Sequence, residues 1–196
     1  MALNAQVVPD DGSGAHLGPD ERELVLATAT QLLAKHGPLK VTFKWVAKAS
    51  DIAVDDVSME WPSMERLVAD VLERLAGQMG GLVGSVGTPL ELLGEGEPID
   101  LYQRIVARSL LDGLNPAALL GDFPHASGWV PILQERLGLD EETVRHRLCQ
   151  IVALAWGWRL FGPHLKIACG LPDVSDETFT EEIHKLVAQI VRLPPI

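Results

Sequence analysis

The segment between residues 42 and 61 constrains the fold more than any other part of the chain. It predicts two short helices, residues 43–50 and 54–61, with a break near Asp51 and with Thr42 as the N-cap of the first helix. Longer helices are predicted immediately before and after this segment. Two short helices joined by a tight turn, between two longer ones, are the layout of a helix-turn-helix domain.

The rest of the chain also shows helical periodicity. Further helices are expected at residues 19–36, 100–114 and 129–137, and others begin after the N-caps Asp140 and Ser175. The helix after Asp140 is expected to kink or break where a proline follows Phe161-Gly162, because proline lacks the N–H that would continue the helix. Strand-like alternation is absent, so the sequence predicts an all-α protein.

A glycine-rich stretch divides the chain. Seven glycines fall between Gly77 and Gly96, and each costs an interior helical position about 1 kcal/mol relative to alanine. The sequence therefore predicts a connection here rather than a long helix. We expect a mobile arm at residues 1–18, a helix-turn-helix domain at 19–79, and a ligand-binding and dimerisation domain at 80–196.

Composition narrows the function classes. With 196 residues, 47% of them hydrophobic and 22% charged, the chain has the profile of a soluble globular protein. It lacks both an apolar run long enough for a membrane span and a signal-peptide pattern, and its two cysteines match no metal spacing, so a reduced, cytoplasmic location is expected. The net charge of −11 disfavours non-specific nucleic-acid binding.

Enzyme motifs are not found in the sequence. There is no phosphate-binding glycine loop, nucleophile elbow or His-x-x-x-His pair, and the six histidines are scattered. His125, in a Phe-Pro-His segment, is interpreted as a surface or core histidine rather than a ligand. We therefore predict no catalytic residue, no metal and no cofactor.

The sequence TFKWVAKASDIAVDDVSMEWPSMERL, residues 42–67, resembles the helix-turn-helix of the TetR family of bacterial transcriptional regulators. Thr42, Val46 and Ala47 match the family pattern of Thr followed by an Ile/Val-Ala-x-x-Ala unit, and Ala49 lies one residue before the last Ala of that unit. Residues 156–163, WGWRLFGP, resemble the penultimate helix of many actinobacterial members. The resemblance spans about residues 19–193.

This resemblance implies a homodimer that binds operator DNA and is released or retuned by a small hydrophobic ligand, without a membrane partner. The positions expected to contact double-stranded DNA are Thr42, Lys44, Lys48, Val54 and Ser58. Residues expected to line a ligand pocket are Tyr102, Phe123, Trp129, Trp156 and Phe161. Residues expected at a dimer interface are Leu148, Ile151, Val152, Ile183, Leu186, Val187 and Ile190.

The second short helix departs from the family pattern in its charge. Residues 51–61 contain four acids, Asp51, Asp55, Asp56 and Glu60, and no base. A carboxylate near a DNA phosphate is repelled by about 1 kcal/mol even in water, although acids in a first helical turn also stabilise the helix. An alternative function therefore stays open, a TetR-derived ligand-binding or partner-binding protein that has lost operator binding.

Overall fold

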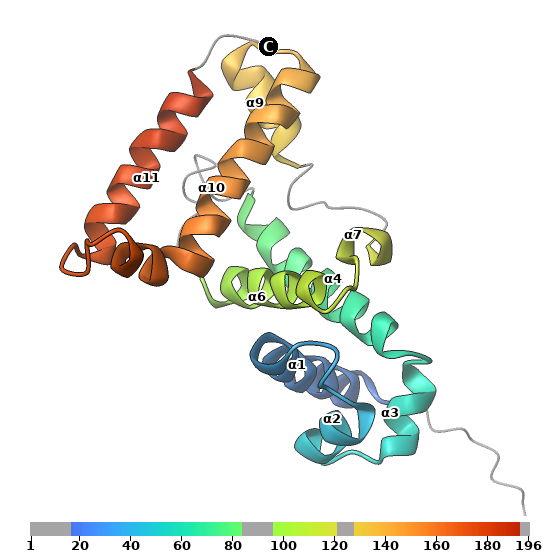
Figure 1. Cartoon of the computed structure of the whole chain (residues 1–196). Helices are drawn as coiled ribbons and strands as arrows, with labels where there is room; N and C mark the ends of the chain where they lie inside the picture. Colours follow the sequence, from blue (N-terminus) through green and yellow to red (C-terminus); the bar gives the residue numbers. More distant parts are fainter. Residues whose placement is uncertain (1–16, 84–95, 121–127, 193–196) are drawn as a thin grey trace, which may run out of the picture.

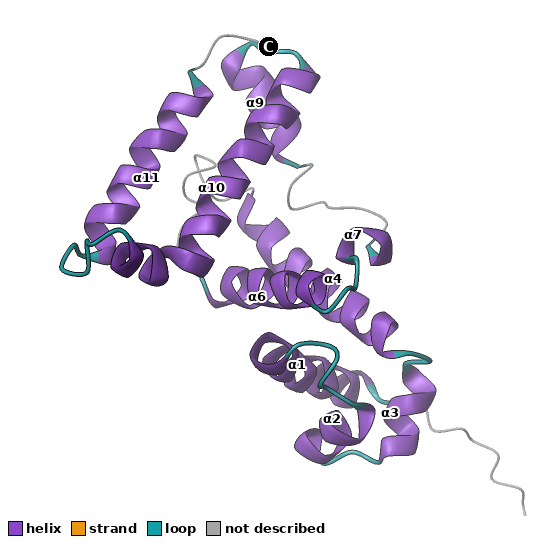
Figure 2. Cartoon of the chain, in the orientation of Figure 1, coloured by secondary structure: helices purple, strands orange, loops and turns teal. Residues whose placement is uncertain are grey.

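The computed structural model describes residues 17–83, 96–120 and 128–192, and every regular element in these ranges is a helix (Figure 2). The elements are α1 (Pro19–His36), α2 (Phe43–Ser50), α3 (Val54–Glu60), α4 (Met64–Val83), α6 (Glu97–Leu111), α7 (Pro116–Leu119), α9 (Trp129–Leu137), α10 (Glu141–Ala168) and α11 (Asp176–Val191). The predicted all-α class is thus confirmed. None of these helices is long and apolar enough to cross a membrane.

Helix starts follow the predicted capping chemistry. The side-chain oxygens of Thr42, Asp140 and Ser175 accept hydrogen bonds from the backbone N–H groups of Trp45, Thr143 and Thr178. Each cap satisfies one of the N–H groups that the first helical turn leaves without a partner. These three helices therefore begin where local sequence predicts.

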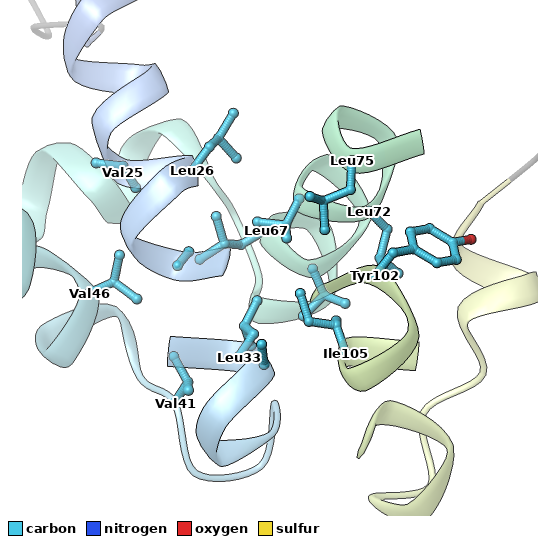
Figure 3. Packing of buried hydrophobic residues seen from close by; sticks show 14 of the residues in the cluster. Val25, Leu26, Leu33, Val41, Val46, Leu67, Leu72, Leu75, Tyr102 and Ile105 are labelled. Carbon is cyan, nitrogen blue, oxygen red and sulfur yellow. The ribbon is translucent and has the colours of Figure 1, made fainter. Parts of the chain in front are cut away.

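The largest hydrophobic core joins helices α1 to α4 with α6. Figure 3 shows Leu33 of α1, Leu67 and Leu72 of α4, and Ile105 of α6 converging within it, and each of these side chains is fully buried. The four-residue helix α7 lies beside α6, and Leu120 just after it completes this core. Because α1 contacts α2, α4 and α6, the helix-turn-helix is built against the same core as α6.

Helix α4 corrects one expectation from the sequence. It continues through Gly77 to Val83 instead of ending at the glycine-rich stretch. The buried side chains of Leu75 and Met79 extend its apolar stripe past Gly77. Burying these two side chains contributes about 1.5–3 kcal/mol each, which offsets the cost of about 1 kcal/mol for each of the three glycines in α4, Gly77, Gly80 and Gly81. Residues 84–95 of the glycine-rich stretch and 1–16 of the N-terminal arm lie outside the described residues.

The C-terminal helices form a second, smaller core. Trp129, Val130 and Leu133 of α9 pack against Val144 and Leu148 of α10. Helix α11 lies along α10, where Trp158 and Phe179 stack with ring centroids 4.7 Å apart. Of the kink or break expected near Pro163, the structure shows a kink, since α10 continues to Ala168 as one helix. It bends near this end (Figure 1), as the missing proline N–H requires.

Candidate nucleic-acid interface and ligand pocket

Helices α2 and α3 present the candidate DNA-facing surface. Their buried faces, which include Val46, Ala47 and Val57, pack into the main core. Lys44 and Lys48 lie exposed on one side of α2, one turn apart. On α3 the exposed side chains include Val54 and Ser58, both expected to contact DNA.

The turn between α2 and α3 has an uncommon backbone conformation. Asp51 closes α2 with φ 56° and ψ 40°, in the left-handed region that favours glycine. Ala53, the N-cap of α3, has no side-chain oxygen with which to cap the helix. The acids Asp55 and Asp56 in the first turn of α3 stabilise it in place of a cap.

An ion-pair cluster fixes the C-terminal end of α3 against the neighbouring helices. Arg22 of α1 donates to the Glu60 carboxylate at 2.9 Å and to Asp70 of α4 at 2.5 Å. Asp70 also accepts a hydrogen bond from the Trp61 indole at 3.1 Å and pairs with Arg66 at 2.7 Å. The Arg22 guanidinium lies over the Trp61 ring, 5.4 Å from its centroid. The orientation of α3 is therefore tied to both α1 and α4.

This cluster corrects the expectation for Glu60. Its carboxylate is 18% exposed and neutralised by Arg22, so it does not add its charge to the exposed face of α3. Arg22 and Asp70, whose contacts hold the C-terminal end of α3, were not predicted from the sequence. The i, i+4 spacing of Arg66 and Asp70 was the one local signal that could have indicated the cluster.

The remaining charges divide the candidate interface into two parts. Lys40, Lys44 and Lys48 are exposed on or just before α2, whereas Asp51 and Asp55 are exposed at the turn and on α3. The Ser58 hydroxyl donates to the backbone oxygen of Asp55 at 3.0 Å. The surface is therefore cationic along α2 and anionic at the start of α3.

The residues predicted to line a ligand pocket fall into three places. Tyr102 and Trp156 meet edge to face with ring centroids 6.0 Å apart. Trp129 is buried between α9 and α10, and Phe161 is 57% exposed on α10. Phe123 lies outside the described residues. The five-residue pocket stays a prediction, within which the structure brings Tyr102 and Trp156 together.

Two buried polar atoms in this part of the chain are available to form hydrogen bonds with a ligand. Gln103 Oε1 and Trp129 Nε1 are buried without a hydrogen-bond partner among the described residues. Leaving such a group unpaired costs about 1–3 kcal/mol, which a bound ligand can offset. Burial also raises the pKa of the Tyr102 hydroxyl to about 12, so it is protonated at neutral pH.

The predicted dimer residues lie on α10 and α11. Ile151 and Val187 are fully buried within the chain, and Leu148 is nearly so. Val152, Ile183 and Ile190 are half-buried, and Leu186 is 45% exposed. Much of the apolar stripe of α11 is thus uncovered by its own chain.

Comparison with known proteins agrees with this architecture. HTH-type transcriptional repressor Rv3405c of Mycobacterium tuberculosis and HTH-type transcriptional regulator Mb3439c of Mycobacterium bovis are each 28% identical over 167 residues, 85% of this chain and 87% of each relative. A solved structure of a TetR family member from Streptomyces coelicolor has a TM-score of 0.58 at 15% identity, covering 88% of this chain and 98% of that one. No family model matches the sequence. The predicted resemblance to the TetR family is confirmed.

Proposed function

We propose that this protein, which has the fold of a TetR family structure, is a cytoplasmic transcriptional repressor that binds operator DNA as a homodimer and responds to a small hydrophobic ligand. The observation that carries the proposal is the helix-turn-helix itself. Arg22 and Asp70 hold the C-terminal end of α3, and side chains along the rest of the helix, such as Val54 and Ser58, are exposed. Such a helix can enter the major groove while α2 crosses the DNA backbone.

Lysines of α2 supply the phosphate contacts in this proposal. Neutralising one phosphate changes the log–log salt dependence of binding by about one unit. Titrating the native protein and the Lys44→Ala and Lys48→Ala variants against the DNA upstream of its own gene, over a range of salt, tests this role. Each variant should lower the slope and weaken binding to all sequences alike. Lys185→Ala, which removes an exposed charge from α11, should leave both unchanged.

The homodimer in this proposal rests on α11. Its exposed and half-buried apolar side chains need a partner surface, and a second copy supplies the same stripe through a two-fold axis. A stable interface of this kind buries more than about 1,000 Å² in total. Sedimentation velocity should give a dimer at micromolar concentration, and a monomer there would contradict the proposal.

The hydrophobic ligand in this proposal lies beside Tyr102 and Trp156. A compound that binds the native state alone raises the melting temperature by mass action. A panel of acyl and aromatic compounds should include some that raise it. Replacing Trp156 with Leu should reduce that rise, measured from the variant's own unliganded melting temperature, which should itself fall because Trp156 packs against Tyr102. Absence of any shift across the panel would remove the ligand from the proposal.

A second candidate function rests on the acids of α3. Exposed Asp55 and its neighbour Asp56 oppose phosphate, which favours a ligand-binding or partner-binding protein without operator recognition. Replacing Asp55 with Ser and Asp56 with Lys separates the two. A regulator binds its operator about a thousandfold or more above random DNA, and the variant erodes that ratio. A native protein that retains no genomic fragment at low salt, while the variant does, would favour the second function.

A further inference from the structure

A groove of about 990 Å³ opens between α1, the start of α2, α6 and the C-terminal part of α10. It is distinct from the Tyr102–Trp156 contact, neither of whose residues lines it. Four cations line the groove, Lys35, Arg104, Arg108 and Arg159, and none of its described lining residues is acidic. In a chain with 27 acids and 16 bases, this is a marked local excess of positive charge.

Few of these cations are neutralised by the fold. Arg159 pairs with Asp100 beside the groove. Arg108 uses its Nε to donate to the backbone oxygen of Ala34 at 2.9 Å, which is a neutral partner. Lys35 and Arg104 are exposed. The groove therefore favours a negatively charged group, for which arginine offers two parallel donors.

The same groove has an apolar wall. Leu32 and Leu101 are half-buried in it, and Leu111 and Phe161 expose 86% and 57% of their surface to solvent. Exposed large apolar side chains next to a group of cations match a molecule with an anionic head and an apolar body. A DNA phosphate would use the cations and leave these apolar side chains in water.

We infer that this groove is a binding site for a small amphipathic anion, of the chemistry of a carboxylate on an apolar chain. The position of the site gives binding a route to the helix-turn-helix. Arg108 holds the end of α1 through Ala34, and Asp112, one turn further along α6, accepts from the backbone N–H of Leu39 at 3.1 Å. An anion that engages Arg108 acts on this contact between α6 and the α1–α2 connection. This consequence for DNA rests on the proposed function, whereas the site itself does not.

Binding is measured on the full-length protein without DNA, by isothermal titration with decanoate. Decan-1-ol serves as the neutral probe of equal chain length, and acetate as the anion without an apolar body. Decanoate should bind at least about tenfold more tightly than either probe, because only it uses both surfaces. Equal binding of decan-1-ol would overturn the anionic part of the inference, and equal binding of acetate would overturn the apolar part.

Matched variants locate the site. Arg104→Ala removes an exposed groove cation and should weaken decanoate binding about tenfold or more. Lys185→Ala, at a residue that does not line the groove, should change it less than twofold. Unchanged melting temperatures establish that both variants fold. Loss of decanoate binding in Trp156→Leu but not in Arg104→Ala would place the ligand beside Tyr102 and overturn the groove site, leaving the proposed function intact.

Measurements of DNA affinity test whether the groove binds the DNA backbone instead. Arg104→Ala and Lys35→Ala should leave the affinity for upstream DNA within about twofold, unlike Lys48→Ala, because one lost phosphate contact has a larger effect. If they weaken DNA binding as much as Lys48→Ala, and decanoate does not bind, the groove serves the DNA backbone and the inference is wrong.

Discussion

Helices α1 and α11 have similar lengths, 18 and 16 residues, but α1 buries six of its residues and α11 buries only Val187. Helix α1 lies at the centre of the first core, in contact with α2, α4 and α6 (Figure 1). Helix α11 contacts mainly α10 and leaves an apolar side exposed. The helix-turn-helix region is therefore stabilised within one chain, whereas the C-terminal helix pair leaves apolar surface exposed.

Truncating a side chain of the first core should destabilise the protein most. Leu72→Ala removes a fully buried side chain and should lower the free energy of unfolding by about 2–5 kcal/mol, through lost burial and the cavity left behind. The matched change Leu186→Ala, on α11, should cost the monomer less than about 1 kcal/mol. Urea denaturation at several protein concentrations measures both.

The dependence of stability on protein concentration tests whether α11 meets a second chain. If α11 meets a second chain, Leu186→Ala should shift the denaturation midpoint most where the native protein is dimeric, because association stabilises by mass action. A loss from Leu186→Ala as large as that from Leu72→Ala at every concentration would break the distinction between the two regions.

The ion pairs of buried Asp70 should contribute more to stability than an exposed ion pair on α10. Asp70 is 7% exposed and bound by Arg22, Trp61 and Arg66. Asp70→Asn keeps its shape but removes its charge, and should cost about 2 kcal/mol because the arginine partners lose their counter-charge. Glu141→Gln removes the surface pair with Arg145, in which both side chains are 57% exposed, and should cost about 0.5 kcal/mol or less. Thermal denaturation compares the two, and equal losses would contradict the positioning role of Asp70.

Alkaline pH tests the core near α6. The pKa of Tyr102 is raised to about 12 by burial, above the value of about 10 in an unfolded chain. The unfolded state therefore loses its proton first as pH rises. Stability from this group is fully present below about pH 10 and falls by about 1.4 kcal/mol per pH unit until the folded pKa is reached.

The titration of Tyr102 can be followed without overlap from other tyrosines, because Tyr102 is the single tyrosine of the chain. Tyrosinate absorbance followed with pH reports its pKa directly, and Tyr102→Phe should remove this share of the alkaline loss of stability. A midpoint near the unfolded value in the intact protein would show that the ring is accessible to water.

Local chemistry explains which features the sequence could predict. The caps at Thr42, Asp140 and Ser175 were predictable because a capping side chain bonds to a backbone group only three residues away. The end of α4 was not, since its extension depends on Met79 meeting a core built by other helices. Burial of Met79 in this core extends the helix, although the local glycines disfavour helical structure.

The same distinction applies to the candidate site. Exposure of Lys44 and Lys48 follows from the pattern of α2, but the pairing of Glu60 depends on Arg22, 38 residues away in the sequence. Likewise, Phe161 lines a cationic groove because α10 passes α6, which no pattern within α10 indicates. Sequence reasoning therefore recognised the surface of α2 and missed the contacts that orient α3.

The smallest expected effect is on α10, where two interior glycines form a matched pair. A Cβ at Gly157 would meet nothing within 4 Å, whereas one at Gly162 would lie 3.0 Å from the Trp158 ring. Gly157→Ala should therefore stabilise the protein by about 0.5–1 kcal/mol, the difference in helix propensity. Gly162→Ala gains the same propensity but must displace the Trp158 ring from its stack on Phe179 of α11, so its net effect should be close to zero or destabilising.

Differential scanning calorimetry measures the difference between these two variants. Because Trp158 joins α10 to α11, Gly162→Ala should also weaken the proposed dimer in sedimentation, whereas Gly157→Ala should not. Equal stabilisation by both changes would mean that the Trp158 ring can move off Phe179 without a loss of stability. The contact between α10 and α11 would then contribute less to stability than its stacked geometry indicates. The difference in stability between this helix pair and the core around α1 would be larger than their burial alone implies.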